Sequence, residues 1–180
     1  MRITDEKSID IIEMVLGGLI NKDIVNTITS LGGKAVGLSG KDGGLIRAKK
    51  IEGEGEFKNI DFKNTGTVKS IDPGVVKLLD GSTFIPVIAP IGIGDDGKTY
   101  NINADIVAGK IAHILQASKY LILTNTQGIL DSNGNLIQSI NTDGVKKLVE
   151  KGILSQGMVP KVNSASVSYT HLTLPTSIQV

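Results

Sequence analysis

The chain has 180 residues, 40% of them hydrophobic and 21% charged, which is the ordinary composition of a globular protein. Its net charge of +1 and aromatic content of 3% give no basis for binding nucleic acid, stacking bases or attracting an anionic membrane. Cysteine is absent and the two histidines, His113 and His171, are far apart, so disulfides, thiolate metal sites and transition-metal centres are not expected.

The N-terminal region carries no signal peptide, and the apolar segment at residues 11–20 is interrupted by Glu13 and too short to span a bilayer. We therefore expect a soluble cytoplasmic protein. Apolar residues at helical spacing predict the first helix, with Thr4 or Asp5 as its N-cap.

Helical and strand patterns alternate along the chain, which predicts an α/β protein with a mostly parallel sheet. Apolar spacing and glycine stop signals predict the helices, whereas alternating or continuous apolar runs predict the strands. Helices are predicted over residues 5–19, 21–30, 73–79, 104–116 and 142–150. Strands are predicted over residues 34–38, 84–89 and 120–124, with hairpins over residues 45–70 and 91–102 and around Asn133-Gly134.

Two glycine patterns in the sequence resemble parts of nucleotide-binding loops. Residues 92–97 match GxGxxG, but they lie at a hairpin turn, and Ala117 stands where a dinucleotide fold needs an acidic residue. Gly40-Lys41 and Gly109-Lys110 lack the upstream glycine and the following Ser or Thr of a P-loop. Neither nucleotide motif is present.

The segment Tyr100-Asn101-Ile102-Asn103-Ala104-Asp105 places two amides and a carboxylate before a helix. If the segment is extended, Asn101, Asn103 and Asp105 share one face and form a polar site. If the helix begins here, Asn103 is an N-cap and Asp105 suits the positive helix end. Capping does not account for Asn101, and the two interpretations remain open.

Two further segments have the residue types of a nucleotide site. Small polar residues and a glycine at residues 123–128 follow the predicted strand over residues 120–124, and ligands of open α/β sheets bind at such strand ends. Lys161 follows a glycine and a proline near a predicted helix start, where a cation opposes the helix dipole unless an anion binds there.

Several strings together resemble the acetylglutamate kinases of the amino-acid kinase family. They are GGKAVGLSGKDGGLIRA at residues 32–48, TYNINAD at residues 99–105, LTNTQGILD at residues 123–131 and GMVPKV at residues 157–162. The resemblance covers residues 2–165. It implies a three-layer α/β/α sandwich whose central sheet is mostly parallel. Residues 1–116 would belong to the acyl-amino-acid lobe, which also mediates dimerisation, and residues 117–166 to the ATP lobe.

The resemblance also implies roles for individual residues. Arg2 would pair with a substrate carboxylate, Asn101 would hold the acetylated amino acid and Asn103 would support it. Asp105 would organise lysines near the phosphates, and Lys161 would neutralise the transferring phosphoryl group. The implied nucleotide-binding residues are Asn125, Thr126, Gln127, Gly128, Ile129, Leu130, Ile153, Leu154 and Ser155.

The implied reaction is ATP-dependent phosphorylation of the side-chain carboxylate of N-acetyl-L-glutamate, a step of arginine biosynthesis. ATP with Mg²⁺ would be the cofactor, no metal site would be built from the protein alone, and the enzyme would be a homo-oligomer, a dimer or hexamer. The family's Lys-x-Gly-Gly and His-Gly-Gly loops would precede Arg2, so we expect the 180-residue chain to be inactive alone. The ending SYTHLTLP resembles a translated sequencing adapter, and residues 167–180 are expected to be foreign to the fold.

Two alternatives remain. A kinase of the same fold could act on another acidic amino-acid derivative, such as carrier-bound aminoadipate. The chain could also be a non-catalytic module that binds a nucleotide or effector. The substrate pocket distinguishes the first alternative. For the second, glycine loops encoded immediately upstream would favour the enzyme, and a genuine start codon and promoter before Met1 would favour the module.

Overall fold

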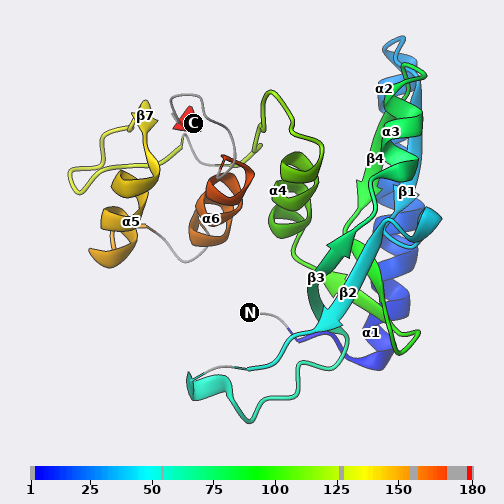
Figure 1. Ribbon diagram of the computed structural model, residues 1–180, viewed down its shortest axis with the longest axis horizontal. Coiled ribbons are helices and arrows are strands. Elements are labelled where there is room, and N and C mark those ends of the chain that lie inside the picture. Colours follow the sequence, from blue (N-terminus) through cyan, green and yellow to red (C-terminus); the bar gives the residue numbers. More distant parts are fainter. Residues whose placement is uncertain (1–2, 54, 126–127, 155–157, 170–177, 180) are drawn as a thin grey trace. The chain divides into compact units, whose positions relative to one another are not determined.

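The computed structural model describes residues 3–53, 55–125, 128–154, 158–169 and 178–179 and combines helices with parallel and antiparallel strands (Figure 1). The α/β class predicted from the sequence is confirmed. The chain divides into two compact units, Met1–Val107 and Ala108–Val180. The division falls inside helix α4 (Ala104–Ile114), whereas the lobe boundary inferred above followed residue 116.

The first unit begins with one continuous helical run, made of α1 (Glu6–Ile12), the π-helical segment η1 (Glu13–Ile20) and α2 (Asn21–Ser30). Asp5 is its N-cap, because the carboxylate accepts from the backbone N–H groups of Lys7 and Ser8 at 3.1 and 2.7 Å. The helix predicted over residues 21–30 is confirmed with the bounds of α2, but it continues directly from η1 instead of starting after a break. Ile20 keeps helical dihedrals, so the π-helical segment passes into α2 without interrupting the run.

Strands β1 (Ala35–Ser39) and β4 (Ile85–Ala89) pair in parallel over their whole length, and α2 and α3 (Gly74–Asp80) pack against them. Asn21 is a buried polar residue at this contact. Its side-chain amide donates to the carbonyls of Leu38 and Val87 at 3.1 and 2.8 Å. The helical run is therefore hydrogen-bonded to both strands, and the burial of an amide is compensated.

Two hairpins form a small closed barrel. Strand β2 (Ile46–Lys50) is antiparallel to β3 (Thr65–Ile71), and β5 (Ile91–Gly94) is antiparallel to β6 (Thr99–Ile102). Parallel pairings of β2 with β5 and of β3 with β6 close the ring in the order β2-β3-β6-β5. Both predicted hairpins are confirmed. The buried apolar residues of these strands and of the residue before β2 are Leu45, Ile46, Ala48, Val68, Ile91, Tyr100 and Ile102.

The GxGxxG pattern serves the second of these hairpins. Gly97 turns it with φ of 76°. Gly94 has no space for a side chain, because a Cβ there would lie 2.6 Å from the Tyr100 ring. The predicted hairpin turn is confirmed, since these glycines belong to a strand and its turn.

Short 3-10 turns occupy two of the first unit's loops. Segment η2 (Asp42–Gly44) lies between β1 and β2, and η3 (Gly55–Phe57) lies between β2 and β3. The η2 turn lies within the short connection between β1 and β2, which is therefore structured.

The second unit contains the end of α4, then β7 (Ser139–Ile140), α5 (Thr142–Glu150), α6 (Met158–Tyr169) and β8 (Ile178–Gln179). Helix α5 has the predicted bounds, and Asn141 caps it by accepting from the Gly144 N–H at 2.8 Å. The core of the second unit consists of Ile129, Val145, Val162 and Ala165. The partly buried residues that pack around this core are Tyr120, Ile122, Ile137, Ile140, Leu148, Leu154 and Met158. The inferred tail over residues 167–180 begins within α6, and residues 170–177 and 180 lie outside the described residues.

The predicted central strand over residues 120–124 was wrong for the described structure, which assigns no strand there. Tyr120 and Ile122 pack against the core of the second unit, whereas Leu121 and Leu123 are 78% and 94% exposed. The continuous apolar run is therefore not sufficient by itself to make these residues a strand in the described structure. Helix α4 also ends before the predicted residue 116, and Gln116 has a left-handed φ of 51°.

Candidate functional site

The candidate site in the first unit is built around Asn101 in β6. Its neighbours Tyr100 and Ile102 are buried, so alternation along the strand directs Asn101 to the other face, where it is half-buried. Its side-chain Nδ2 donates to Thr4 Oγ1 at 3.2 Å. A residue of β6 is thereby bonded to the segment that precedes α1.

Thr4 is 2% exposed and joins three parts of the first unit. Its N–H donates to Thr65 Oγ1 at 2.8 Å, its carbonyl accepts from the Asn64 N–H at 2.9 Å, and it forms a parallel bridge with Lys63. The segment that follows Arg2 is therefore held against β3 and β6. Arg2 itself lies outside the described residues.

Asn64, just before β3, is the second amide of the cluster, and unlike Asn101 it is buried. Its Nδ2 donates to the Thr99 carbonyl at 3.0 Å, and its own carbonyl accepts from the Asn101 N–H at 2.9 Å. Among the described residues, every buried side-chain polar atom has a hydrogen-bond partner. The cluster of Thr4, Asn64, Thr65, Thr99 and Asn101 is thus internally satisfied, as buried polar networks must be to hold one geometry.

Asn103 caps helix α4. Its Oδ1 accepts from the backbone N–H groups of Asp105 and Ile106 at 2.9 and 3.2 Å. The extended face proposed for Asn101, Asn103 and Asp105 was wrong, because β6 ends at Ile102 and the chain turns into the helix. Capping therefore accounts for Asn103, and Asn101 has a separate role.

Asp105 and Lys161 lie in the first turns of two helices. Asp105 is half-buried in α4, within the first unit, and Lys161 is half-buried in α6, within the second. The prediction that Lys161 lies near a helix start is confirmed. Each residue is described within its own unit, and their catalytic roles remain predictions.

The residues expected to bind nucleotide fall into three groups. Thr126, Gln127 and Ser155 lie outside the described residues. Ile129 and Leu154 pack in the core of the second unit, and Gly128 is buried with φ of 137°. Asn125 and Leu130 are exposed, and Ile153 is half-buried.

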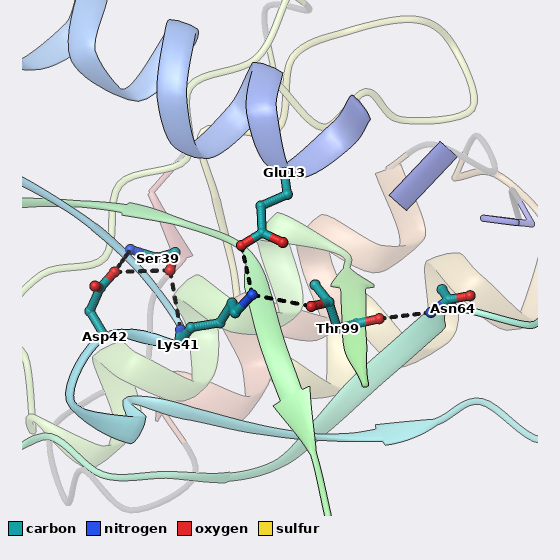
Figure 2. Close-up of polar contacts among 6 residues, drawn as sticks. All are labelled: Glu13, Ser39, Lys41, Asp42, Asn64 and Thr99. Atoms are coloured by element: carbon teal, nitrogen blue, oxygen red, sulfur yellow. Dashed lines mark hydrogen bonds and ion pairs between the residues drawn. The ribbon is translucent and has the colours of Figure 1, made fainter. Parts of the chain in front are cut away.

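Lys41 is a polar residue that the sequence motifs did not identify. Its ammonium group lies 2.8 Å from Glu13 Oε1 and donates to Thr99 Oγ1 at 3.3 Å (Figure 2). In the sequence this lysine lies only in a rejected phosphate-loop pattern and in the string at residues 32–48. Both partners are distant in sequence, so no local pattern could have indicated them.

A polar cavity of about 540 Å³ lies beside the cluster and is lined by Asn64 and Tyr100. The remaining lining residues are charged and of both signs: Asp5, Glu6, Lys7, Lys50, Asp61, Lys63, Asp96 and Lys98. Lys50 and Asp61 form an ion pair at 2.5 Å, and the hydrogen bond from Lys50 lowers the pKa of Asp61. The mixed charge gives this cavity no preference for one class of ion.

The Tyr100 hydroxyl donates to Asp96 Oδ2 at 2.9 Å beside that cavity. Burial, followed by this bond, raises the pKa of Tyr100 above its ordinary value of 10.0. The backbone N–H of Lys98, followed by the Tyr100 hydroxyl, lowers the pKa of Asp96. The pair therefore favours a neutral phenol beside a charged carboxylate.

The described residues include no group of three or more His, Cys, Asp or Glu side chains placed to hold a metal ion. In the same part of the chain, no helix combines the length and apolarity needed to cross a bilayer.

The chain matches the amino acid kinase family over residues 1–170. Proteins named acetylglutamate kinase from Alkalilimnicola ehrlichii, Halorhodospira halophila and Nitrosomonas eutropha are each 52% identical to it over 92% of its length. The chain spans only 56 to 57% of the length of those relatives.

Two solved structures resemble the fold of this chain. The crystal structure of smu.665 from Streptococcus mutans UA159 superposes with a TM-score of 0.82 at 25% identity, covering 93% of this chain and 66% of that one. N-acetylglutamate synthase from Neisseria gonorrhoeae, complexed with coenzyme A and N-acetyl-glutamate, gives a TM-score of 0.81 at 21% identity, over 93% of this chain and 37% of that one. The second likeness concerns the fold alone. From the family match over residues 1–170, this chain belongs to the amino acid kinase family.

Proposed function

We propose that this chain is part of an ATP-dependent kinase that phosphorylates the side-chain carboxylate of N-acetyl-L-glutamate. The observation that carries the proposal is its 52% identity, over 92% of its length, to proteins named acetylglutamate kinase. The arrangement around Asn101 supports it, because that amide is held by buried partners beside the segment that follows Arg2.

We assign acyl-amino-acid binding to the first unit. Arg2 would pair with a substrate carboxylate through two parallel N–H groups, and Asn101 would bond the acetylated amino acid. Asn101 is half-buried, so its amide is partly accessible while Thr4 fixes its position. Asn103 would act indirectly, by starting helix α4 and so positioning Asp105.

We assign ATP binding to the second unit, and Mg²⁺ would accompany the ATP. Magnesium is commonly held by phosphates, waters and one or two carboxylates, so a built cluster of ligands is not required. Lys161, in the first turn of α6, is the residue type and location that suit a phosphate group. Asn125 offers exposed polar surface, whereas Ile129 and Leu154 would shape the lobe from its core.

In the proposed reaction a carboxylate oxygen attacks the γ-phosphorus of ATP while the bond to the ADP oxygen breaks, which gives an acyl phosphate and ADP. Lys161 would offset the negative charge of the transferring group, and Asp105 would orient the lysines around it. Because the chain spans 56 to 57% of its relatives, turnover is proposed for the whole protein. For the 180 residues alone we expect substrate binding without turnover.

We further propose that the whole enzyme is a homo-oligomer. The helical run of the first unit exposes large apolar side chains, among them Ile11, Met14, Leu19 and Ile24. We call these exposed side chains the apolar strip. The helical run packs on β1 and β4 with its other residues, so the apolar strip is available for self-association.

The binding experiment uses the 180-residue chain with N-acetyl-L-glutamate, N-acetyl-L-aspartate and N-acetyl-L-2-aminoadipate in calorimetric titrations. We expect N-acetyl-L-glutamate to bind most tightly, and Asn101→Ala to weaken it about tenfold or more, because a buried polar contact is lost. Asn133→Ala, in the exposed turn of the second unit, is the matched control and leaves affinity unchanged.

Turnover is measured separately, by trapping acyl phosphate with hydroxylamine in the presence of ATP and Mg²⁺. Tighter binding of the aminoadipate derivative would replace the substrate assignment. Binding of nucleotide without any of the three acids would favour a non-catalytic module. Hydroxamate formed by the 180 residues alone would overturn the expectation that they lack turnover.

A further inference from the structure

Lys41 connects three elements of the first unit. It lies in the loop after β1, its ammonium pairs with Glu13 in η1 at 2.8 Å, and it donates to Thr99 in β6 at 3.3 Å (Figure 2). The side chains of Lys41 and Glu13 are only 35% and 34% exposed. Partial removal from water strengthens such a pair relative to one on the open surface.

The loop that carries Lys41 is itself fixed by local hydrogen bonds. Asp42 Oδ2 accepts from the N–H and the hydroxyl of Ser39 at 2.6 and 2.9 Å, and Ser39 Oγ accepts from the Lys41 N–H at 3.3 Å (Figure 2). The backbone of Lys41 therefore has a defined position. Its ammonium group reaches Thr99 from a preorganised support rather than from a mobile loop.

Thr99 connects Lys41 to the cluster around Asn101 by hydrogen bonds. While its hydroxyl accepts from Lys41, its carbonyl accepts from Asn64 Nδ2 at 3.0 Å. The Asn64 carbonyl accepts from the Asn101 N–H, and the Asn64 N–H donates to Thr4. Thr4 in turn accepts from Asn101 Nδ2. A continuous set of hydrogen bonds thus runs from Glu13 to Asn101.

We propose that Lys41 is a positioning residue for Asn101, acting through Thr99 and Asn64. It holds the first residue of β6 against the helical run, and thereby sets where the Asn101 amide lies. The effect on ligand affinity rests on the proposed function, in which Asn101 contacts the acyl amino acid. The effect on Asn101 itself does not depend on any ligand.

The test compares Lys41→Met, which keeps the aliphatic stem without the charge, with Lys41→Arg, which keeps the charge. Glu13→Gln removes the anchoring carboxylate. Lys146→Met is the matched control, because Lys146 is exposed and pairs only at 3.9 Å with Asp143 in α5. The side-chain amide signals of Asn64 and Asn101 are followed by two-dimensional NMR, and affinity for N-acetyl-L-glutamate by calorimetry.

Lys41→Met is expected to shift both amide signals and weaken affinity about tenfold, because misplacing a contacting group by a fraction of an ångström is costly. Lys41→Arg is expected to restore both readouts, and Lys146→Met to change neither. Glu13→Gln is expected to shift the same signals by a smaller amount.

Unchanged amide signals in Lys41→Met would overturn the proposal, whatever happens to stability. If Lys41→Met does not fold, Glu13→Gln decides, and unchanged Asn101 signals in that variant are the contrary result. If the unsubstituted chain does not bind N-acetyl-L-glutamate, the proposed substrate is wrong, while the amide signals still test the positioning role.

Discussion

Asn101 donates a hydrogen bond from its side-chain amide to the hydroxyl of Thr4 at 3.2 Å, across 97 residues of sequence. Thr4 is buried, and its hydroxyl, N–H and carbonyl all have partners. The bond therefore ties strand β6 to the segment before α1. It places the amide of Asn101 and the residues that follow Arg2 in one neighbourhood, which neither segment could specify alone.

Thr4→Val is expected to lower the free energy of unfolding by about 1–2 kcal/mol, because a nearly isosteric methyl replaces the acceptor of Asn101 Nδ2. Thr4→Ser keeps the hydroxyl and is the control for that loss. Urea denaturation measures both variants. Equal stability of Thr4→Val and the unsubstituted chain would contradict the importance of the bond.

Asn103→Ala is expected to reduce stability by about 1 kcal/mol, since it removes the acceptor for the first N–H groups of α4. Asn103→Asp retains a capping oxygen and is expected to restore stability together with ligand affinity. Thermal unfolding and calorimetric titration are measured on the same samples. If Asn103→Asp binds N-acetyl-L-glutamate as poorly as Asn101→Ala, then Asn103 contacts the ligand directly.

The Tyr100–Asp96 pair predicts a dependence of stability on alkaline pH. Because the pKa of Tyr100 is raised in the folded state, its contribution is fully present below pH 10.0 and is lost as pH rises through the folded pKa. Tyr100→Phe removes this titration. The stability difference between the two proteins is therefore expected to shrink as the pH rises above 10.0 in urea denaturation.

Asp96 gives the opposite limb of the same experiment. The pKa of Asp96 is lowered in the folded state. Its contribution to stability is therefore present above pH 3.8 and is lost as the pH falls through the folded-state pKa. Asp96→Asn is expected to be less sensitive to acid than the unsubstituted chain. A difference between Tyr100→Phe and the unsubstituted chain that stays constant through the alkaline range would be evidence against the coupling.

Gly109→Ala is expected to destabilise the second unit by about 1–3 kcal/mol, because the added methyl group overpacks the contact between α4 and α6. A Cβ at Gly109 would lie 2.7 Å from the Ser164 carbonyl oxygen. Gly81→Ala is the control, since Gly81 has φ of −62° and its nearest contact would be 3.5 Å. The control is expected to leave stability unchanged or raise it by about 0.5 kcal/mol in thermal unfolding.

Met14→Lys and Leu19→Lys are expected to convert the proposed homo-oligomer into monomers, because each puts a charge into an exposed apolar strip. Light scattering after size exclusion measures the mass. Leu121→Lys, at a 78% exposed position of the second unit, is the control and should leave the mass unchanged. An oligomer that survives both helix substitutions would show that the strip does not form the interface.

Local patterns determined much of the secondary structure. The turn at Gly97, the cap at Asp5 and the two hairpins follow from short-range chemistry, and the structure confirms each of them. The same holds for α5, whose capping asparagine and apolar spacing lie within one short segment. These features depend on residues that are neighbours in sequence.

The tertiary structure decided the rest. An apolar run at residues 120–124 has the local pattern of a buried strand, yet the described structure assigns no strand there, and Leu123 is exposed. The TYNINAD segment left capping and ligand binding open for its two asparagines, and the fold separated them by giving Asn103 to the helix and Asn101 to Thr4. The Lys41 ammonium bonds Glu13 and Thr99, which lie in other elements and are distant in sequence. Hydrogen bonds are short and directional, so which distant groups meet is determined only once the chain has packed.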